Sequence, residues 1–315
     1  MKKGIMLLSL LLTLMFLFPT SALALDKVAQ SGVQFLKIGV GARAVGMGEA
    51  FVAVADDPTA LYWNPAGLVN VEGKAFTVSY NKWIAETTHS FVGYAQYFPG
   101  LGTFGISFVN FSVGEIDETE PGIGLTGRTY GASDFMAGLS YSRRLTDKFS
   151  VGGTLKMINS YIADESAAGW AADVGTLYDT GFRTIRLGMV IQNFGGDIKY
   201  IGEDTPLPIT FKAGVAMDLL NRDAHAVTGS IEMRHPNDNA ETVQMGGEYW
   251  FNNMVATRLG YRYNYDAGGL TAGFGVRLDI GGSQFELDYS YTDMGEYLGP
   301  NFGDNPQRIG ATLKF

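Results

Sequence analysis

The stretch that decides the fold is GLTAGFGVRLDIGGSQFELDYSYT, residues 269–292, where apolar and polar side chains alternate with a period of two. That period places successive side chains on opposite faces of a β-strand. Phe274 and the other large apolar residues share one face, while Gly275, Arg277 and Glu286 belong to the opposite, polar face. We therefore expect two amphipathic strands joined at Gly281-Gly282, with Gly275 tolerating a polar side chain better than Phe274.

The same alternation recurs from Lys74 onward, in segments of about 10–15 residues separated by turn signals. The predicted strands cover residues 75–84, 89–98, 102–113, 132–144, 147–161, 166–178, 183–194, 207–219, 223–233, 240–251, 254–264, 269–280, 283–292 and 306–315. An even number of antiparallel strands, about 14, favours an all-β fold that closes into a transmembrane barrel. Two soluble β-sandwiches would also use many short strands, but they would not have an apolar exterior.

The composition agrees with a barrel in a membrane. The 315 residues include 42 glycines and 13% aromatic residues, only 17% are charged, and the formal net charge is −9. Soluble domains usually carry roughly 25% charged residues. The sequence has no cysteine, which excludes thiolate catalysis, disulfides and cysteine metal sites. Its acidic balance argues against nucleic acid as a partner.

Both ends of the chain carry export signals. Residues 1–24 combine a basic start, an apolar run and small residues before Ala24, which is the pattern of a cleavable secretory signal peptide. The last predicted strand, RIGATLKF, ends on Phe315 and resembles the insertion signal of outer-membrane barrels, which the barrel assembly machinery reads. We therefore expect a Gram-negative-type outer-membrane protein surrounded by outer-membrane lipids.

The connections between strands predict the two rims of the barrel. Residues 114–131, 195–206 and 293–305 are acidic or rich in glycine and proline, so we expect extracellular loops there. Asn252-Asn253 and Gly281-Gly282 suit short periplasmic turns. Trp83 and Trp250 are expected in the aromatic girdles at the membrane interfaces.

Residues 25–73 do not alternate like the strands of residues 74–315. Fourteen strands enclose a lumen too wide for their own side chains to fill, because eight strands already approach that limit. Residues 25–73 are therefore the candidate for a hatch, or plug, inside the lumen. Within this region Asn64 precedes Pro65, which disfavours helical backbone at Asn64, so the helical turn is expected to end at Trp63.

The segment GARAVGMGEAFVAVADDPTALYWNPAGL, residues 41–68, resembles the N-terminal signature of the PorV/PorQ family, relatives of the FadL long-chain fatty-acid transporters. The resemblance implies a fourteen-stranded barrel whose N-terminal hatch contains an Asn-Pro-Ala motif, matched here by Asn64, Pro65 and Ala66. It leaves two functions open. One is a passive channel for hydrophobic small molecules such as fatty acids, gated by the hatch. The other is a non-transporting partner in a type IX-like secretion or surface-attachment system.

Two sets of hatch residues are candidates for function. Met47, Phe51, Tyr62 and Trp63 are expected either to form an apolar ligand-binding patch in the lumen or to pack the hatch against the wall. Arg43, Asp56 and Asp57 are expected to anchor the hatch to inward charges such as Arg258, Arg262, Arg277 or Glu286.

The sequence contains no recognisable catalytic or metal-binding pattern. His89 and Ser90 are adjacent in a predicted strand, so they face opposite sides and cannot form a nucleophile–base pair. The three histidines lack the spacing of metal ligands, and the glycines of residues 39–48 do not match a dinucleotide-binding motif. We expect no enzymatic activity, no metal site and no cofactor.

Overall fold

The computed structural model describes residues 31–122, 124–200, 202–265, 268–295 and 304–315, so the predicted signal peptide lies outside the described residues. Its helical turns are η1 (Gln34–Lys37), α2 (Ala42–Gly46), α3 (Ala60–Trp63), η2 (Pro65–Asn70) and η3 (Ile84–Glu86). Among the residues described, none of these helices has the length and apolar character needed to cross a bilayer.

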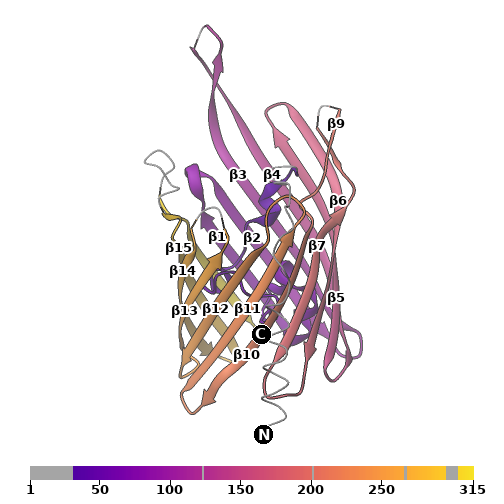
Figure 1. Ribbon diagram of the computed structural model, residues 1–315, viewed down its shortest axis with the longest axis vertical. Coiled ribbons are helices and arrows are strands. Elements are labelled where there is room, and N and C mark those ends of the chain that lie inside the picture. Colours follow the sequence, from indigo (N-terminus) through magenta and orange to yellow (C-terminus); the bar gives the residue numbers. More distant parts are fainter. Residues whose placement is uncertain (1–30, 123, 201, 266–267, 296–303) are drawn as a thin grey trace, which may run out of the picture.

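The strands are β1 (Lys74–Lys82), β2 (Thr88–Phe98), β3 (Gly102–Glu120), β4 (Gly124–Thr146), β5 (Phe149–Ile162), β6 (Glu165–Asp179), β7 (Arg186–Gly195), β8 (Ile198–Tyr200), β9 (Glu203–Thr205), β10 (Thr210–Arg222), β11 (His225–Pro236), β12 (Thr242–Phe251), β13 (Val255–Tyr263), β14 (Leu270–Ile280), β15 (Ser283–Thr292) and β16 (Gln307–Lys314). In the described chain, fourteen of them close into one barrel, and β8 and β9 form a separate hairpin. Closure comes from β1, which pairs antiparallel with both β2 and β16 (Figure 1). The predicted fold class is confirmed.

The two faces of the barrel wall differ as the alternation predicts. Large apolar side chains such as Phe274, Leu259 and Ile231 are exposed on the outside, whereas Arg258 and Glu286 are buried on the inside. In hydrocarbon every backbone N–H and C=O must be paired, which a closed barrel achieves. The exterior therefore suits acyl chains, and the polar side chains face the lumen.

The rims agree with the sequence in part. Asn252 and Asn253 form a tight turn with φ angles of 51° and 54°, the left-handed backbone that two-residue hairpins use. The prediction of a loop over residues 114–131 is wrong, because β3 and β4 continue as a paired ribbon that projects beyond the other strands (Figure 1). Residues 195–206 contain the β8–β9 hairpin. The predicted loop 293–305 lies largely outside the described residues.

The prediction that Trp83 and Trp250 belong to the interfacial girdles is wrong. The Trp250 ring lies on the lumen side, 3.9 Å from the Arg277 guanidinium carbon and 5.4 Å from that of Arg258. The Trp83 ring lies 5.1 Å from the guanidinium carbon of Arg308, which is also buried in the lumen. Stacking on buried arginines therefore replaces membrane anchoring for both rings.

Replacing Phe274 with arginine is expected to lower the free energy of unfolding in lipid vesicles by about 2–4 kcal/mol, because the charge would enter the lipid near the middle of β14. Leu278→Arg, nearer the end of the same strand, is the matched control and should cost only about 0–1 kcal/mol. Equal losses in urea titrations of the two variants would contradict the assigned depth.

Gly275 does not serve as the tolerant control that the sequence predicts. A Cβ atom there would lie 2.5 Å from Asp288 Oδ1 and 2.7 Å from Arg258 Nη1. Asp288 and Arg258 form an ion pair of 2.6 Å at this point, so a side chain at Gly275 would have to displace that pair. The assignment of the two faces is nevertheless confirmed, because Gly275 is buried and Phe274 is exposed.

Replacing Phe315 with serine is expected to reduce the amount of barrel that assembles in the outer membrane. The backbone of Phe315 exchanges two hydrogen bonds of 2.9 Å with Lys74, next to the β1–β16 seam, and its half-exposed ring lies on the Lys74 side. The measurement is the yield of heat-modifiable, membrane-embedded protein. A normal yield would show that the terminal aromatic residue has no part in insertion.

Candidate functional site

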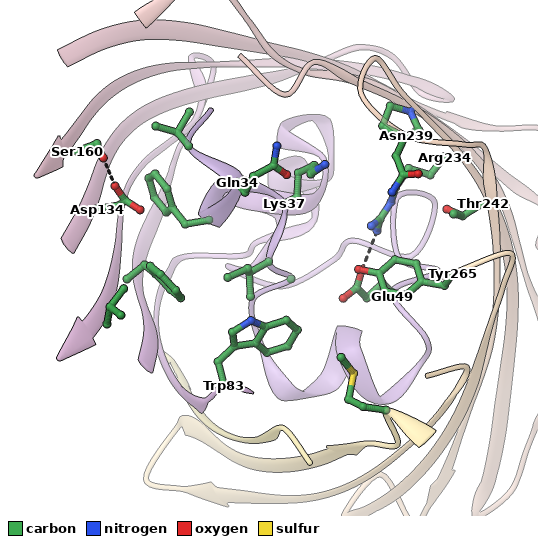
Figure 2. A pocket seen from close by; sticks show the side chains of 18 of the residues that line it. Gln34, Lys37, Glu49, Trp83, Asp134, Ser160, Arg234, Asn239, Thr242 and Tyr265 are labelled. Atoms are coloured by element: carbon green, nitrogen blue, oxygen red, sulfur yellow. Dashed lines mark hydrogen bonds and ion pairs between the residues drawn. The ribbon is translucent and has the colours of Figure 1, made fainter. Parts of the chain in front are cut away.

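Residues 31–73, called here the inner segment, lie inside the ring of strands (Figure 2). Near its start, Lys37 forms an ion pair of 2.8 Å with Asp238, which follows β11. At its end, the chain passes directly into β1 at Lys74, at the opposite rim. Between these points α2 packs against β13 to β16, and η2 packs against β3 to β6. The inner segment therefore crosses the lumen from one rim to the other.

The inner segment rests directly on the backbone of the wall at a set of glycines. A Cβ atom at any of these positions would come closer than normal contact to an atom of the inner segment. In the described chain this glycine ring comprises Gly93, Gly105, Gly152, Gly175, Gly188, Gly214, Gly246, Gly260 and Gly273, each on a different strand. Glycine permits this close approach because it has no side chain. The ring leaves no room for even a methyl group between wall and segment.

The Asn-Pro-Ala motif fixes one turn of the inner segment to the wall. The helical turn α3 ends at Trp63, as predicted, and Asn64 is extended with φ −161°. The Asn64 side-chain amide donates to Val52 O at 2.9 Å and to Thr176 O on β6 at 3.0 Å. Its oxygen accepts a hydrogen bond from the backbone N–H of Ala66 at 3.1 Å, and Pro65 starts η2. Asn64 thus joins the segment to itself and to the barrel.

The four apolar candidates form the core of the inner segment. Met47, Phe51 and Trp63 are fully buried, and Tyr62 is 4% exposed. The Trp63 ring packs edge-to-face on Phe51 at 6.1 Å and on Tyr62 at 5.0 Å between ring centroids. Its indole N–H donates to Val40 O at 3.0 Å. These rings pack within the segment and lie away from the lining of the large cavity described below.

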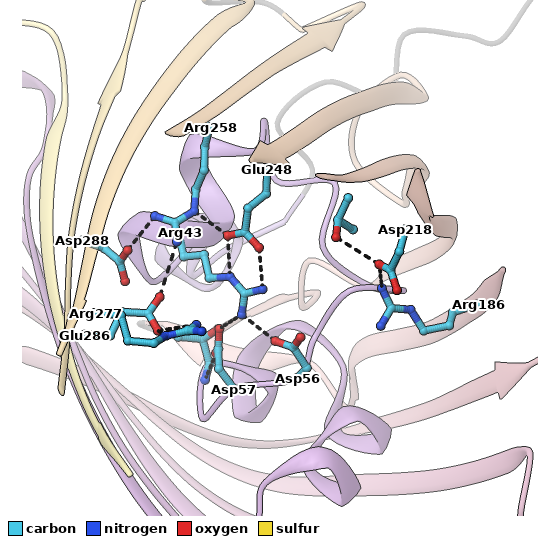
Figure 3. Close-up of polar contacts among 12 residues, drawn as sticks. Arg43, Asp56, Asp57, Arg186, Asp218, Glu248, Arg258, Arg277, Glu286 and Asp288 are labelled. Atoms are coloured by element: carbon cyan, nitrogen blue, oxygen red, sulfur yellow. Dashed lines mark hydrogen bonds and ion pairs between the residues drawn. The ribbon is translucent and has the colours of Figure 1, made fainter. Parts of the chain in front are cut away.

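A cluster of ion pairs joins the inner segment to the wall (Figure 3). Arg43 pairs with Asp56 at 2.5 Å and Asp57 at 2.8 Å within the segment, and with Glu248 on β12 at 2.8 Å. Glu248 also pairs with Arg258 on β13 at 2.6 Å. Since removing one partner of a buried pair leaves an uncompensated charge, each member stabilises the position of the others.

The anchor residues meet the wall differently from the sequence prediction. Glu248 was missed, although it shares the inward face of β12 with Gln244 and Trp250. Glu248 pairs with both Arg43 and Arg258. Arg258 also forms an ion pair with Asp288 at 2.6 Å. Two other predicted partners belong to the same cluster, because Glu286 pairs with Arg258 and with Arg277. Arg262 lies outside this cluster and pairs with Glu49.

A cavity of about 600 Å³, the outer cavity, lies at the rim from which the β3–β4 ribbon projects. Its apolar lining comes from the inner segment and from the wall, and includes Val33, Phe35, Ile38, Phe111, Val113 and Ile162. Polar and charged side chains also line it at several places, as Figure 2 shows for Gln34, Lys37 and Asp134. The Asp134 carboxylate accepts a hydrogen bond from Ser160. A cavity of this size and lining suits a small hydrophobic ligand.

One part of the outer cavity is lined by charged side chains of the inner segment and the wall. Glu49 of the segment pairs with Arg234 on β11 at 2.7 Å. This ion pair attaches Glu49, and with it the inner segment, to the wall. Among the described residues, no group of three or more His, Asp or Glu side chains is placed to hold a metal ion.

The barrel, its apolar exterior and the segment lodged in its lumen define an outer-membrane β-barrel protein. The family described as "Type IX secretion system protein PorV" matches residues 22–237, and the chain belongs to this family. A comparison with curated proteins finds no match.

Several solved structures share the fold. The toluene transporter TbuX of Ralstonia pickettii has 14% identity and a TM-score of 0.62, over 87% of this chain and 97% of that chain. The toluene transporter TodX of Pseudomonas putida has 14% identity and a TM-score of 0.61, over 87% and 97%. A FadL homologue of Pseudomonas aeruginosa has 11% identity and a TM-score of 0.56, over 88% and 98%.

Proposed function

We propose that this protein is a passive outer-membrane channel for hydrophobic small molecules, with the outer cavity as the first binding site and the inner segment as a hatch. The observation that carries the proposal is the outer cavity of about 600 Å³, whose apolar walls lie directly above a segment seated on the glycine ring. Ligand sites in proteins typically enclose about 300–1,000 Å³. The toluene transporters with the same fold support this assignment by analogy.

Filling the outer cavity tests this function. Ala132 lines the cavity from β4, so Ala132→Trp should occupy much of its volume and remove most of the uptake. Ala137 lies on the opposite face of the same strand, and Ala137→Trp is the matched control that should leave uptake unchanged. The measurement is entry of radiolabelled toluene into whole cells that carry each variant in the outer membrane. Equal uptake by both variants, or uptake no faster than in cells without the protein, would refute the proposal.

A second candidate function is a subunit role in protein secretion, which the family description favours. The β3–β4 ribbon adds a structural reason. It projects past the rim with both edges open, and it carries Glu115, Asp117, Glu118 and Glu120 (Figure 1). Open strand edges are sites where another chain can add a strand.

Shortening the ribbon separates the two functions. Deleting residues 115–129 removes the projecting part and leaves the outer cavity lining in place. A secretion subunit would then lose its partner proteins in a native pull-down while toluene uptake stayed normal. A channel without a secretion role would keep its uptake and would have no ribbon-dependent partner to lose.

A further inference from the structure

Three arginines are buried in the lumen beside Glu49 and below the outer cavity. Arg234 on β11, Arg262 on β13 and Arg308 on β16 are 7%, 2% and 1% exposed. We call them the arginine layer. Glu49 lies 2.7 Å from Arg234 and 3.7 Å from Arg262. Within the described chain, Arg308 has no carboxylate in ion-pair distance, and its hydrogen bond to Thr292 Oγ1 is long, at 3.4 Å.

The charges around the layer do not balance. Lys212 is the register partner of Arg234, and Glu232 lies one inward position further along β11. Glu232 Oε2 accepts hydrogen bonds from the backbone N–H groups of Phe51 and Val52, at 2.9 and 2.8 Å. One of its two oxygens is therefore already bonded to the inner segment. Among the residues that the structure describes, the three arginines and Lys212 thus have Glu49 and Glu232 as their neighbouring carboxylates. A buried excess of positive charge is unfavourable unless an anion compensates it.

Unpartnered polar atoms gather at the same place. In the part of the chain that the structure describes, the Nε–H groups of Arg234, Arg262 and Arg308 have no hydrogen-bond acceptor. Two neighbours of Arg308 also have buried atoms without a partner there: Ser290 Oγ, in register on β15, and His89 Nε2, two strands away across β1. An arginine Nε–H can only donate, so the missing group must accept hydrogen bonds.

We propose that the arginine layer is an anion-binding site that takes one small monoanion, a carboxylate or a halide, between Arg262 and Arg308. An aromatic ring lies next to each of these two guanidiniums. The Tyr265 ring lies 4.3 Å from the Arg262 guanidinium carbon, and the Trp83 ring lies 5.1 Å from that of Arg308. Both rings line the cavity, so the site adjoins the space assigned to the hydrophobic ligand.

The monoanion has two possible sources with the same chemistry. One is a free anion from solution. The other is the acid group of an amphipathic ligand whose tail occupies the outer cavity, and this source rests on the proposed channel function. Arginine suits either, because its planar guanidinium binds carboxylates with paired hydrogen bonds and remains charged when buried.

Calorimetric titration of the full-length protein in neutral detergent and chloride-free buffer tests the site, with acetate, dodecanoate and dodecanol as probes. Acetate should bind to the unmodified protein. Arg308→Gln should weaken acetate binding by roughly 30-fold or more, because a desolvated charge pair loses one member. Arg222→Gln makes the same change at an exposed position at the end of β10 and should leave binding unchanged. Arg222→Gln thus controls for the loss of charge itself.

The probes separate the two sources and the two proposals. Dodecanoate that binds more tightly than acetate indicates the acid group of a ligand, whereas equal binding indicates a free anion. Acetate binding that depends on Arg308, with no binding of dodecanoate or dodecanol, supports the anion site and contradicts the channel. If dodecanol binds, and Arg308→Gln does not change the binding of acetate or dodecanoate, the anion site is overturned. The proposed channel function is then still supported.

A second measurement covers the case in which Arg308→Gln does not fold. Crystals of the unmodified protein soaked in bromide should show an anomalous peak between Arg262 and Arg308. A map without a peak there, at a concentration where other bromide sites are filled, would overturn the proposal.

Discussion

Replacing Gly246 with leucine is expected to open the closed barrel to ions. Gly246 lies on the inward face of β12, and a Cβ atom there would lie 2.9 Å from both the carbonyl carbon and the Cβ of Met47. The obstacle includes the backbone of the inner segment, so a change of side-chain rotamer cannot relieve it. Overpacking of this kind costs about 1–3 kcal/mol. We expect the inner segment to shift, and the measurement is ion conductance in planar bilayers.

The adjacent residue provides the control for Gly246. Gly247 belongs to the opposite face of β12, where a Cβ atom would meet nothing closer than Thr228 O at 3.9 Å. Gly247→Leu should therefore stay closed and keep the stability of the unmodified protein. Gly246→Leu could assemble as a heat-modifiable barrel and conduct no more ions than Gly247→Leu. That result would show that contact at the glycine ring does not keep the lumen closed to ions.

Deleting residues 41–67 is expected to leave a folded barrel that conducts ions and makes cells sensitive to bulky antibiotics. The strands begin at Lys74, and their backbone pairing does not use the deleted residues. Water should fill the space that the segment leaves, because the lumen of fourteen strands is too wide for wall side chains to close. The water would also hydrate Glu232 and Glu248, which lose their partners in the segment.

A milder variant should give an intermediate result. Asn64→Ala combined with Pro65→Ala removes the hydrogen bonds to Val52 and Thr176 but keeps the rest of the inner segment. We expect brief, flickering openings in the same bilayer recordings. A deletion variant that does not fold would make residues 41–67 part of the structural core. A deletion variant that folds and stays closed would place the gate elsewhere.

The strands could be predicted from the sequence wherever one face meets lipid and the other meets the lumen. Alternation then has a physical cause, and β14 and β15 are found almost residue by residue. The β3–β4 ribbon was missed because water surrounds it on both faces beyond the rim. A strand such as the one from Glu115 to Glu120 needs no apolar face, so its residues look like those of an acidic loop.

The site was less predictable than the barrel. The inward position of Glu248 and Trp250 could have been found from the alternation of β12. The contact of Gly246 with Met47 could not, since it depends on the path of a segment without periodicity. Likewise the outer cavity combines wall positions such as Phe111 with Phe35 of the inner segment, which are distant in sequence.

The placement of the inner segment also sets an order of events during folding. Its later part, η2, packs against β3 to β6, whereas its earlier part, α2, packs against β13 to β16. Arg43 therefore has no wall partner until β12 brings Glu248 into place, and the barrel seam closes only when β16 reaches β1. The first part of the chain to be made is the last to be seated. A barrel stalled before its final strands would keep the Arg43 pairs with Asp56 and Asp57, but the inner segment would still lack its wall partner Glu248.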